Sequence, residues 1–372
     1  MIKVFEPKIT FSDKYHILKN LNKNYISGTS PVVNEFEELL AKEFNRKYCI
    51  CVSNGSVALE VALKSLDLPK GSEIILPSFT IISCLSAVLR AGLKPIFCDV
   101  DINSWNMNID NIKNVYTSKT KAILMVHTYG LPCDIIEIIN FCKKNNIKLI
   151  EDAAEAHGLK IDNKPCGSFG DVSTFSFYAN KHITTGEGGA ILTNSKKSYE
   201  LIKLMINLDF REPNRFNHEN FYWNYRISGI QAALGISQMK SLYKTIEKKK
   251  YQGTVYNILF EELVNQNKIQ IPLSSLNGTN NNYWVYGVLL RNNISREKVR
   301  KILLDNKIET RDFFWPLHKQ KAFLKINKSN NFNLHNSEFL GNYGFYIPMG
   351  QHLKKKDQEY IAKNIYNILM NK

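Results

Sequence analysis

Short β-rich runs alternate with longer helical patterns between residues 48 and 194, and this alternation most limits how the chain can fold. The β-rich runs include residues 74–76, 96–98, 122–126 and 148–150. Between them, apolar residues recur every three or four positions over residues 57–65, 83–91 and 135–144. Such alternation is typical of βαβ units, so we predict an α/β fold with a mainly parallel sheet and helices on both faces.

The pattern becomes more helical after residue 194. Helices are expected over residues 198–207, 228–249, 295–306 and 356–370, and strands over residues 284–290 and 346–348. Two asparagine-rich stretches, near residues 277–282 and 327–334, are expected to be surface loops. The charged end of the helix near residue 249 suggests a boundary, so we predict a large domain over residues 1–250 and a smaller domain over residues 251–372.

The formal net charge of +15 at pH 7 arises from 49 Lys and Arg residues against 34 Asp and Glu residues. The lysines are spread over most helical segments, and no helix-turn-helix, zinc-finger or RNA-binding signature accompanies them. We therefore expect solvated helix faces and no nucleic-acid partner. Any remaining positive field would favour a substrate that carries phosphate groups.

Neither a membrane partner nor a secretory route is expected. No stretch approaches the roughly 20 apolar residues of a membrane span, and residues 1–6 lack the apolar core of a signal peptide. The seven cysteines contain no CxxC pair and lie mostly in apolar contexts, which predicts reduced, structural thiols and no metal site. The cytoplasm is the expected location.

One lysine, Lys181, lies in an aromatic and glycine-rich run over residues 176–189. Partial burial there would lower the pKa of its ammonium group, and a neutral amine can attack an aldehyde such as that of pyridoxal phosphate. Lys181 is therefore interpreted as a Schiff-base lysine. This chemistry would make the chain an enzyme.

Polar residues at predicted strand ends could complete such a site, because ligands of parallel sheets collect at the carboxyl ends of the strands. Gly55 and Ser56 open a helix whose N-terminus could bind a phosphate, although Ser56 could be only a helix cap. Ser176 is a second candidate phosphate donor. His127 and Asp152 each follow a strand, and Asp152 could either keep a pyridine nitrogen protonated or cap a helix. Taken together, these residues predict a pyridoxal-phosphate site.

Motifs along nearly the whole chain resemble those of the DegT/DnrJ/EryC1/StrS sugar aminotransferases. They occur in the order of the family at residues 52–59, 77–80, 151–158, 167–171, 175–189 and 224–226. The resemblance implies a fold-type I pyridoxal-phosphate enzyme: a large domain with a mainly parallel seven-stranded sheet flanked by helices, plus a smaller C-terminal α/β domain. It also implies a homodimer with active sites at the subunit interface.

The resemblance implies catalytic and cofactor-binding roles for residues that match the family motifs. Lys181 would bond covalently to the cofactor, Asp152 would pair with its pyridine nitrogen, and Glu155 would lie near its ring oxygen. The cofactor phosphate would be held by residues from two subunits: Gly55, Ser56 and Ser176 of one subunit and Asn224 of its neighbour.

Residues near the substrate are also implied by the resemblance. Arg311 and His318 match substrate-side positions, although a packing role is an equal alternative for each. Glu155, the run over residues 183–189 and the segments 308–311 and 316–318 indicate the perosamine-forming subgroup of the family.

Two segments depart from the family pattern. Ile81 occupies the position of an aromatic residue that usually stacks on the cofactor ring, so stacking would become aliphatic packing. Residues 207–211 read Asn-Leu-Asp-Phe-Arg where relatives often carry an Arg-Asn-His-Gly turn. Both departures bear on the substrate more than on cofactor binding.

The sequence therefore predicts an aminotransferase that moves an amino group from L-glutamate to a nucleotide-linked 4-keto-6-deoxy sugar, for surface polysaccharide biosynthesis. Another keto sugar, or a small phosphorylated ketone such as dihydroxyacetone phosphate, is the alternative acceptor. A sugar dehydratase of the same fold is disfavoured because such relatives lose the lysine that is present here as Lys181. A non-catalytic binding protein is the rival from a different functional class.

Overall fold

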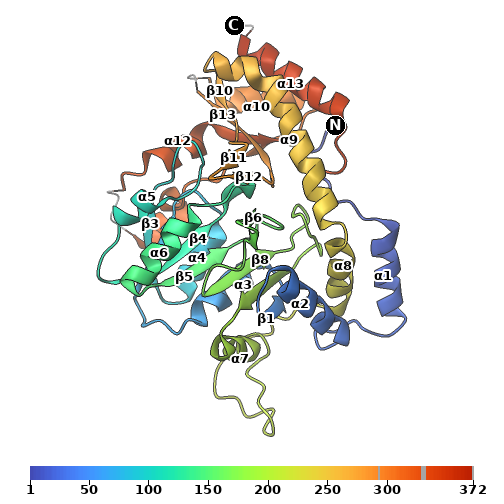
Figure 1. Ribbon diagram of the computed structural model, residues 1–372, viewed down its shortest axis with the longest axis vertical. Helices are drawn as coiled ribbons and strands as arrows, with labels where there is room; N and C mark the ends of the chain where they lie inside the picture. Colours follow the sequence, from blue (N-terminus) through green and yellow to red (C-terminus); the bar gives the residue numbers. More distant parts are fainter. Residues whose placement is uncertain (292–293, 328–331, 371–372) are drawn as a thin grey trace.

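A seven-stranded sheet forms the centre of the computed structural model, which describes residues 1–291, 294–327 and 332–370 (Figure 1). The strand order is β1-β9-β8-β5-β4-β2-β3, and β9 runs antiparallel to its two neighbours while the other adjacent pairs are parallel. These strands are β1 (Tyr48–Val52), β2 (Glu73–Pro77), β3 (Lys94–Cys98), β4 (Thr120–Val126), β5 (Lys148–Asp152), β8 (Val172–Ser176) and β9 (Gly189–Thr193). The predicted mainly parallel sheet is confirmed.

Helices cover both faces of this sheet, because side chains of each strand alternate between two cores. Cys49 and Cys51 belong to a core that includes residues of α2, α6 and α8, whereas Ile50 and Val52 belong to a core that includes residues of α3, α4 and α7. The helical elements of this part are α1 (Phe11–Leu21), α2 (Pro31–Glu43), α3 (Gly55–Lys64), α4 (Ile82–Arg90), α5 (Ile109–Lys113), η1 (Thr128–Gly130), α6 (Ile135–Asn145), α7 (Lys196–Met205) and α8 (Gly229–Met239). A small hairpin joins β6 (Lys160–Ile161) to β7 (Lys164–Pro165).

A smaller antiparallel sheet of four strands lies at the end of the molecule where both chain termini are found (Figure 1). Its order is β10-β13-β15-β14, with strands β10 (Ile269–Gln270), β13 (Tyr286–Leu290), β14 (Arg311–Asp312) and β15 (Gly344–Ile347). Its other elements are the hairpin β11 (Ser275–Leu276) to β12 (Thr279–Asn280), α10 (Arg296–Asp305), η2 (Leu317–Lys319), α11 (Lys321–Ile326), α12 (His335–Tyr343) and α13 (Lys355–Met370).

A long helix, α9 (Leu242–Asn265), connects the two sheets (Figure 1). One continuous helix over residues 228–249 was expected, and this expectation is wrong. The helix ends after Met239, and the Ser241 hydroxyl donates to the carbonyl of Gln238, a local bond that competes with continued helical pairing. The division into domains 1–250 and 251–372 stays a prediction. Ile2 pairs with Ile308, so the amino terminus packs beside the smaller sheet.

The stretch near residues 277–282 is only partly the surface loop that its composition predicts. Asn281 and Asn282 are buried. The side-chain amide of Asn281 donates to the carbonyl of Leu273, and that of Asn282 donates to the carbonyl of His157. The asparagine side chains therefore satisfy buried backbone groups, a role that composition does not reveal. In the other stretch, residues 328–331 lie outside the described residues.

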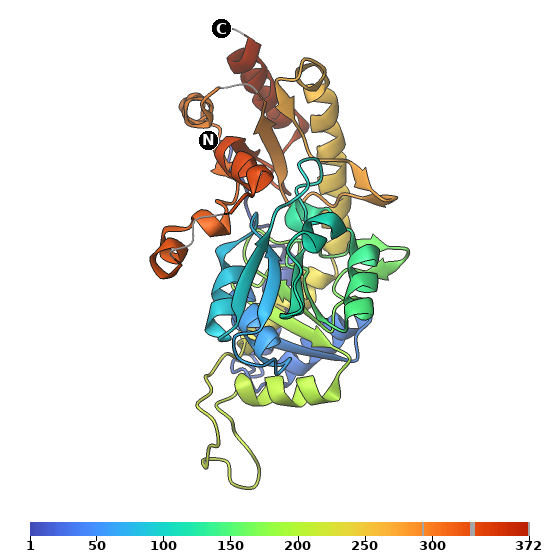
Figure 2. The ribbon, with the colours of Figure 1, turned by 90° about the vertical axis from the view of Figure 1, so that its left-hand side faces the viewer.

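The segment between α7 and α8 projects from the body of the molecule in two perpendicular views (Figures 1 and 2). It carries Phe216, Phe221 and Trp223 with their side chains exposed to solvent. Asp209, fully buried at its base, accepts backbone N–H bonds from Glu219 and Asn220 and so closes the loop. Among the described helices, none is long and apolar enough to cross a membrane.

Candidate active site

A cavity of about 310 Å³ lies where β1, β4, β5 and β8 end at their carboxyl edge. The structure brings six of the predicted site residues to this cavity: Gly55, Ser56, Asp152, Glu155, Ser176 and Lys181. They come from four separate segments of the chain. Parallel strands ending at one edge of the sheet explain why residues so distant in sequence meet here.

One end of the cavity is a cup formed by α3. The helix begins at Gly55, and the side chain of Asn54 caps it by accepting from the N–H of Val57 at 2.9 Å. A Cβ atom placed on Gly55 would lie only 2.8 Å from Cβ of Ser176, so glycine permits the close approach of helix and strand. The first N–H groups of a helix point outward with the positive end of its dipole, which suits a phosphate.

A second helix adds a hydroxyl group to this cup. The Oγ atoms of Ser56 and Ser83 lie 2.7 Å apart, and Ser83 stands in the first turn of α4. Ser83 lines the same cavity and was not predicted from the sequence. The reason is geometric: it becomes a neighbour of Ser56 only when α3 and α4 pack side by side.

The acidic residue of the cavity is Asp152, at the carboxyl end of β5. Its side chain is almost fully buried, and burial raises its pKa, an effect opposed by the N–H of Ala154, which donates to Oδ1 at 3.1 Å. The thiol of Cys84 and the hydroxyl of Thr174 also donate to its two oxygens, at 3.6 and 3.4 Å. These contacts fix the position of the carboxylate at the wall of the cavity.

Lys181 lies in the loop between β8 and β9 with its side chain nearly buried. Its Nζ is 3.4 Å from Oε1 of Glu155 and 3.9 Å from the centre of the Trp284 ring. Burial lowers the pKa of Lys181 and raises that of Glu155 to about 7, and the attraction between the two groups partly offsets both effects. An amine that loses its proton this readily is a nucleophile and a proton carrier.

Three aromatic side chains line the cavity from the side of the smaller sheet: Trp284, Phe314 and Tyr346. The indole N–H of Trp284 donates to the carbonyl of Asn180 at 3.2 Å, which fixes the ring beside Lys181. Ile81, at the start of α4, lines the cavity, and its side chain is 40% exposed. An aliphatic side chain that replaces a stacking aromatic residue has to be exposed to the cavity in this way. The sequence did not predict the three aromatic residues, because only the packing of the two sheets places them here.

The residues of this cavity fit pyridoxal phosphate. A helical cup at Gly55 suits its phosphate, and a buried carboxylate at Asp152 suits its ring nitrogen. A nearly buried amine at Lys181 suits its aldehyde.

The remaining predicted residues do not line this cavity. Asn224 lies between α7 and α8 in the sequence and pairs with Asn207. Arg311 places its guanidinium 4.9 Å from the centre of the Phe5 ring, outside the cavity. His318 is buried, and its two ring nitrogens contact the hydroxyl of Ser78 at 2.7 Å and the carboxylate of Glu338 at 3.0 Å. These contacts favour a packing role for His318.

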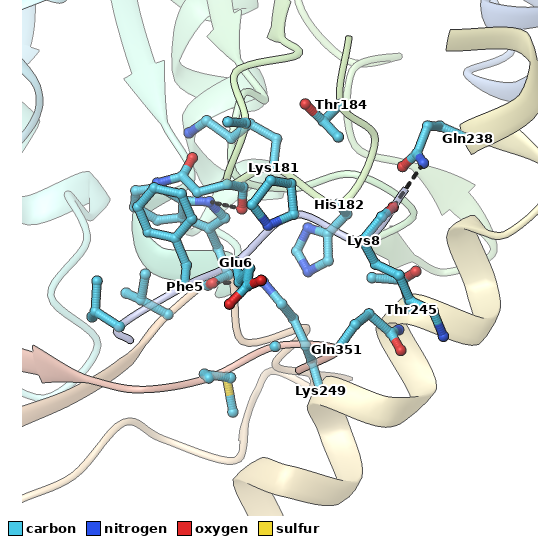
Figure 3. Close-up of a pocket in the computed structure, with 18 of the residues that line it drawn as sticks. Phe5, Glu6, Lys8, Lys181, His182, Thr184, Gln238, Thr245, Lys249 and Gln351 are labelled. Atoms are coloured by element: carbon cyan, nitrogen blue, oxygen red, sulfur yellow. Dashed lines mark hydrogen bonds between the residues drawn. The ribbon is translucent and has the colours of Figure 1, made fainter. Parts of the chain in front are cut away.

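A second cavity, of about 180 Å³, lies on the other side of Lys181 (Figure 3). Asn180, Lys181, Trp284 and Tyr346 line both cavities and so separate them. The N-terminal segment, α9 and the smaller sheet form its remaining walls. No sequence motif predicted this cavity.

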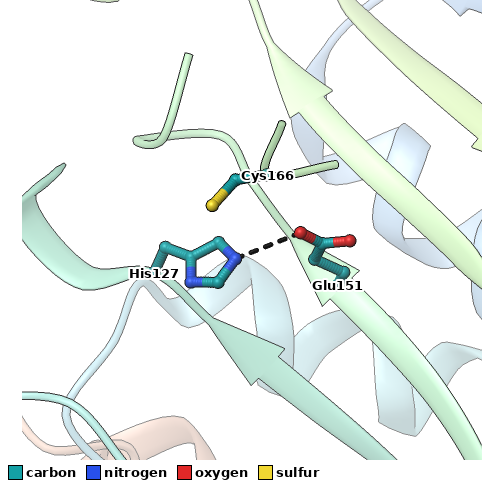
Figure 4. A group of neighbouring side chains, drawn as sticks. All are labelled: His127, Glu151 and Cys166. Carbon is teal, nitrogen blue, oxygen red and sulfur yellow. Dashed lines mark hydrogen bonds and ion pairs between the residues drawn. The ribbon is translucent and has the colours of Figure 1, made fainter. Parts of the chain in front are cut away.

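His127, expected near the ligand because it follows a strand, instead contacts Glu151 beside Cys166 (Figure 4). Their ligand atoms lie within 4.8 Å of one another, a spacing that a metal ion could use. The carboxylate of Glu151, however, already accepts bonds from the N–H groups of Gly167, Phe169 and Gly170, the Ser173 hydroxyl and His127. The cluster is therefore explained as a structural one that fixes the loop after β7.

Replacing Glu151 with glutamine should destabilise the fold by about 3–5 kcal/mol, because a buried and fully bonded carboxylate loses its charge. Its partners, among them His127, lower the pKa of Glu151 to about 2 against the opposing effect of burial. Its contribution is complete above the unfolded-state pKa near 4.5 and is lost as pH falls toward 2. Urea unfolding at several pH values measures this loss.

The matched control is Glu137→Gln, an exposed residue of α6, which should change stability by less than about 0.5 kcal/mol. Equal stability of the Glu151→Gln variant and the unmodified protein at pH 7 would contradict the structural role. So would a difference that stays constant down to pH 3.

Comparison with known proteins identifies relatives over the whole chain. The model of the DegT/DnrJ/EryC1/StrS aminotransferase family matches residues 9–366. The GDP-perosamine synthase of Escherichia coli O157:H7 is 34% identical over 372 residues, covering 100% of this chain and 99% of that protein. The dTDP-3-amino-3,6-dideoxy-alpha-D-galactopyranose transaminase of Aneurinibacillus thermoaerophilus is 33% identical over 303 residues, covering 80% of each.

Among solved structures, Helicobacter pylori PseC, an aminotransferase involved in the biosynthesis of pseudoaminic acid, superposes with a TM-score of 0.93. The alignment covers 100% of both chains at 22% sequence identity, so it supports the fold alone. The relative from Escherichia coli carries the activity of the perosamine-forming subgroup that Glu155 and its neighbouring motifs predicted.

Proposed function

The chain belongs to the DegT/DnrJ/EryC1/StrS aminotransferase family and is a pyridoxal-phosphate-dependent aminotransferase, and we propose that its acceptor is a nucleotide-linked 4-keto-6-deoxy sugar. The donor in this proposal is L-glutamate, and the product serves surface polysaccharide biosynthesis. The main support for this choice of acceptor is the sequence similarity to a GDP-perosamine synthase over the full length of both proteins. The cytoplasmic location stays a prediction.

The cofactor, when bound, supplies a protonated ring that takes up the electron pair released from the substrate carbon. In the proposal, Asp152 keeps the ring nitrogen protonated. Lys181 is the base and acid that moves the proton between the substrate carbon and the cofactor, since its amine is nearly buried and has a lowered pKa. Glu155, 3.4 Å from that amine, is the nearest group able to exchange a proton with it.

The phosphate cup and the aromatic wall have separate tasks in this proposal. Gly55, Ser56 and Ser176 hold the cofactor phosphate at the start of α3. Trp284 and Phe314 shield the reacting atoms from water on the side of the smaller sheet. Arg311 stands farther out and would meet the substrate beyond the cavity rim.

The acceptor can be tested by incubating the holoprotein with L-glutamate and a panel of nucleotide-linked keto sugars and following the products by mass. We expect amination of a GDP-linked 4-keto-6-deoxy sugar and release of 2-oxoglutarate. A dTDP-linked sugar and dihydroxyacetone phosphate serve as comparison acceptors. Preferred turnover of either one would reject the GDP-linked sugar.

A second candidate acceptor is a different keto sugar. The relative from Aneurinibacillus thermoaerophilus, nearly as similar in sequence, forms a dTDP-linked 3-amino sugar, and Ile81 alters the surface beside the cofactor position. Under this alternative, the dTDP-linked arm of the panel gives the aminated product. The small phosphorylated ketone is favoured only if both sugar arms fail.

We also propose a homodimer in which Asn224 of one subunit binds the cofactor phosphate of the other. The projecting segment supports this proposal, because its aromatic side chains Phe216, Phe221 and Trp223 are exposed, and such side chains are enriched in protein interfaces. Asn224 pairs with Asn207, just after the end of α7, and does not line the cavity of its own subunit. The segment projects from the body of the molecule in both views (Figures 1 and 2).

Asn224→Ala should raise the Kd for pyridoxal phosphate by about 10- to 100-fold, because one hydrogen bond to a charged group is lost. Absorbance titration of the apoprotein measures this change. Asn214→Ala, in the same segment, is the control and should leave the Kd unchanged.

Mixing Lys181→Ala with Asn224→Ala tests whether Asn224 acts across the interface, at a cofactor concentration low enough that neither variant alone is active. In hybrids of Lys181→Ala and Asn224→Ala subunits, one site receives an intact Lys181 from one chain and an intact Asn224 from the other. We expect activity to return on mixing. Mixtures that form hybrids without regaining activity would place Asn224 within its own subunit's site.

A further inference from the structure

The second cavity gathers positive charge around a single acidic group (Figure 3). Lys8, Lys244 and Lys249 line it, together with His182. Among the described residues, Glu6 is the only acidic side chain in its walls, and the carboxylate of Glu6 is half exposed and 3.5 Å from Nζ of Lys3. The walls therefore present more cations than the protein itself neutralises.

Lys249 is the unusual member of this group. It is buried in the middle of α9, and its Nζ donates to the carbonyl of Trp284 at 2.8 Å. Within the described ranges, no carboxylate lies within ion-pairing distance of that ammonium. A buried lysine without a counter-ion is costly, and a protein retains one mainly where its charge has a use.

His182 stands beside Lys249 at the same cavity (Figure 3). Its Nε2 is 3.3 Å from the carbonyl of Asn282, an arrangement in which that nitrogen donates. Its Nδ1 is buried, and no atom of the described chain pairs with it. Burial, with the nearby charge of Lys249, holds the pKa of His182 well below its ordinary value, so His182 stays neutral and adds no positive charge to the cavity.

We propose that this cavity binds a small oxyanion, a carboxylate or a phosphate group, held by the ammonium of Lys249 with Lys8 and Lys244 at the rim. Lys8 and Lys244 are exposed, so they attract the anion from solution, while Lys249 forms the buried contact. The cavity is separate from the cup at Gly55, so a phosphate here is not the cofactor phosphate.

Two sources could supply this oxyanion, and the proposed function provides both. The donor carries carboxylates and the acceptor carries a diphosphate. Lys181, Trp284 and two further residues are shared by both cavities, so an anion in the second cavity lies next to the catalytic centre. The proposal of an oxyanion site depends on neither substrate, because it rests on Lys249 and the residues around it.

Binding of the anion should be coupled to proton uptake. Burial and then the nearby charge of Lys181 lower the pKa of Lys249 to about 7, against the opposing charge of Glu155, so Lys249 is mostly neutral at pH 8. An anion favours the charged ammonium and raises that pKa, so a proton is taken up on binding at pH 8 and affinity falls as pH rises above about 7. The other titratable groups of the walls are Glu6, Lys8, Lys181, His182, Lys244 and Tyr346.

Calorimetric titration of the pyridoxal-phosphate-loaded protein tests the proposal, since the cofactor already fills the cup at Gly55. The probes are glutarate, which carries carboxylates without an amino group, and inorganic pyrophosphate. Titrations at pH 8 in two buffers with different heats of ionisation give the number of protons taken up. We expect saturable binding of one probe, with close to one proton taken up, and the preferred probe identifies the source.

Lys249→Met should weaken the binding of that probe by about tenfold or more and abolish most of the proton uptake. Lys250→Met, the adjacent residue of α9 that does not line the cavity, is the matched control and should bind as the unmodified protein does. Equal affinity of Lys249→Met and the unmodified protein would overturn the proposal.

The unmodified protein provides a test that does not depend on any variant. If neither probe binds at millimolar concentration, or if the preferred probe binds at pH 8 with no proton taken up, the oxyanion site at Lys249 is rejected. Calorimetry measures binding and requires no turnover. If none of the nucleotide-linked keto sugars were aminated, the calorimetric test of the oxyanion site would therefore still be valid. Amination of a keto sugar without binding of either probe would reject the oxyanion site and leave the proposed function unchanged.

Discussion

Lys181→Ala should reduce the rate of the half-reaction with L-glutamate by on the order of 10⁴-fold, the upper range for loss of a positioned acid–base group. Two functions are lost together, because the same amine bonds the cofactor and moves the proton. Its neighbours at 3.4 Å and 3.9 Å, Glu155 and the Trp284 ring, cannot take over both tasks. Rapid-mixing absorbance of the cofactor after addition of glutamate measures the effect.

Two observations keep this result interpretable. The Lys160→Ala variant, which changes an exposed lysine of β6, should react at the normal rate. Circular dichroism and a thermal melt show whether the Lys181→Ala protein is folded. A folded Lys181→Ala protein that reacts within tenfold of the normal rate would remove Lys181 from the chemistry.

Asp152→Asn should slow the same half-reaction by roughly 10²- to 10³-fold, the loss typical of removing one preorganised electrostatic contact. Asparagine has nearly the same shape and can still accept from the N–H of Ala154 through its oxygen. What is lost is the negative charge that keeps the ring nitrogen protonated. Cofactor binding should be largely retained, because the phosphate cup and Lys181 are unchanged.

The matched control is Asp162→Asn, which makes the same exchange at an exposed aspartate. The Asp152→Asn variant should show a reduced rate with a Kd for the cofactor within about tenfold of normal. A normal rate would mean that Asp152 acts as a helix or turn cap, the alternative that its sequence context also allows. Loss of cofactor binding together with folding would point to the same structural role.

Much of the large sheet could be predicted from the sequence, because its strands and helices alternate in a regular pattern along the chain. The run at 74–76 is the centre of β2, and the run at 148–150 is the first part of β5. The predicted cavity residues Gly55, Asp152 and Lys181 meet because each stands at or near the end of a strand in one sheet. The alternation of strands and helices is visible in short stretches of sequence, so it can be predicted without knowledge of distant contacts.

Features that depend on packing between distant segments could not be predicted in the same way. Strand β9 follows a glycine-rich loop and runs antiparallel, which no local pattern specifies. Trp284 and Ser83 line the cavity only because two helices and two sheets come together. Lys249 was assigned to a charged helix end, yet it is buried, because α9 continues to Asn265 and packs beneath the smaller sheet.

The central claim is that Lys181 holds the cofactor and that L-glutamate supplies the amino group. Borohydride reduction of the holoprotein, followed by proteolysis and peptide mass measurement, tests both parts. Before glutamate is added, the cofactor mass should be attached to the peptide that contains Lys181. After glutamate is added without an acceptor, that attachment should largely disappear, because the amino group has moved to the cofactor. An unmodified Lys181 peptide at the start, or an attachment that glutamate leaves unchanged, would contradict the account.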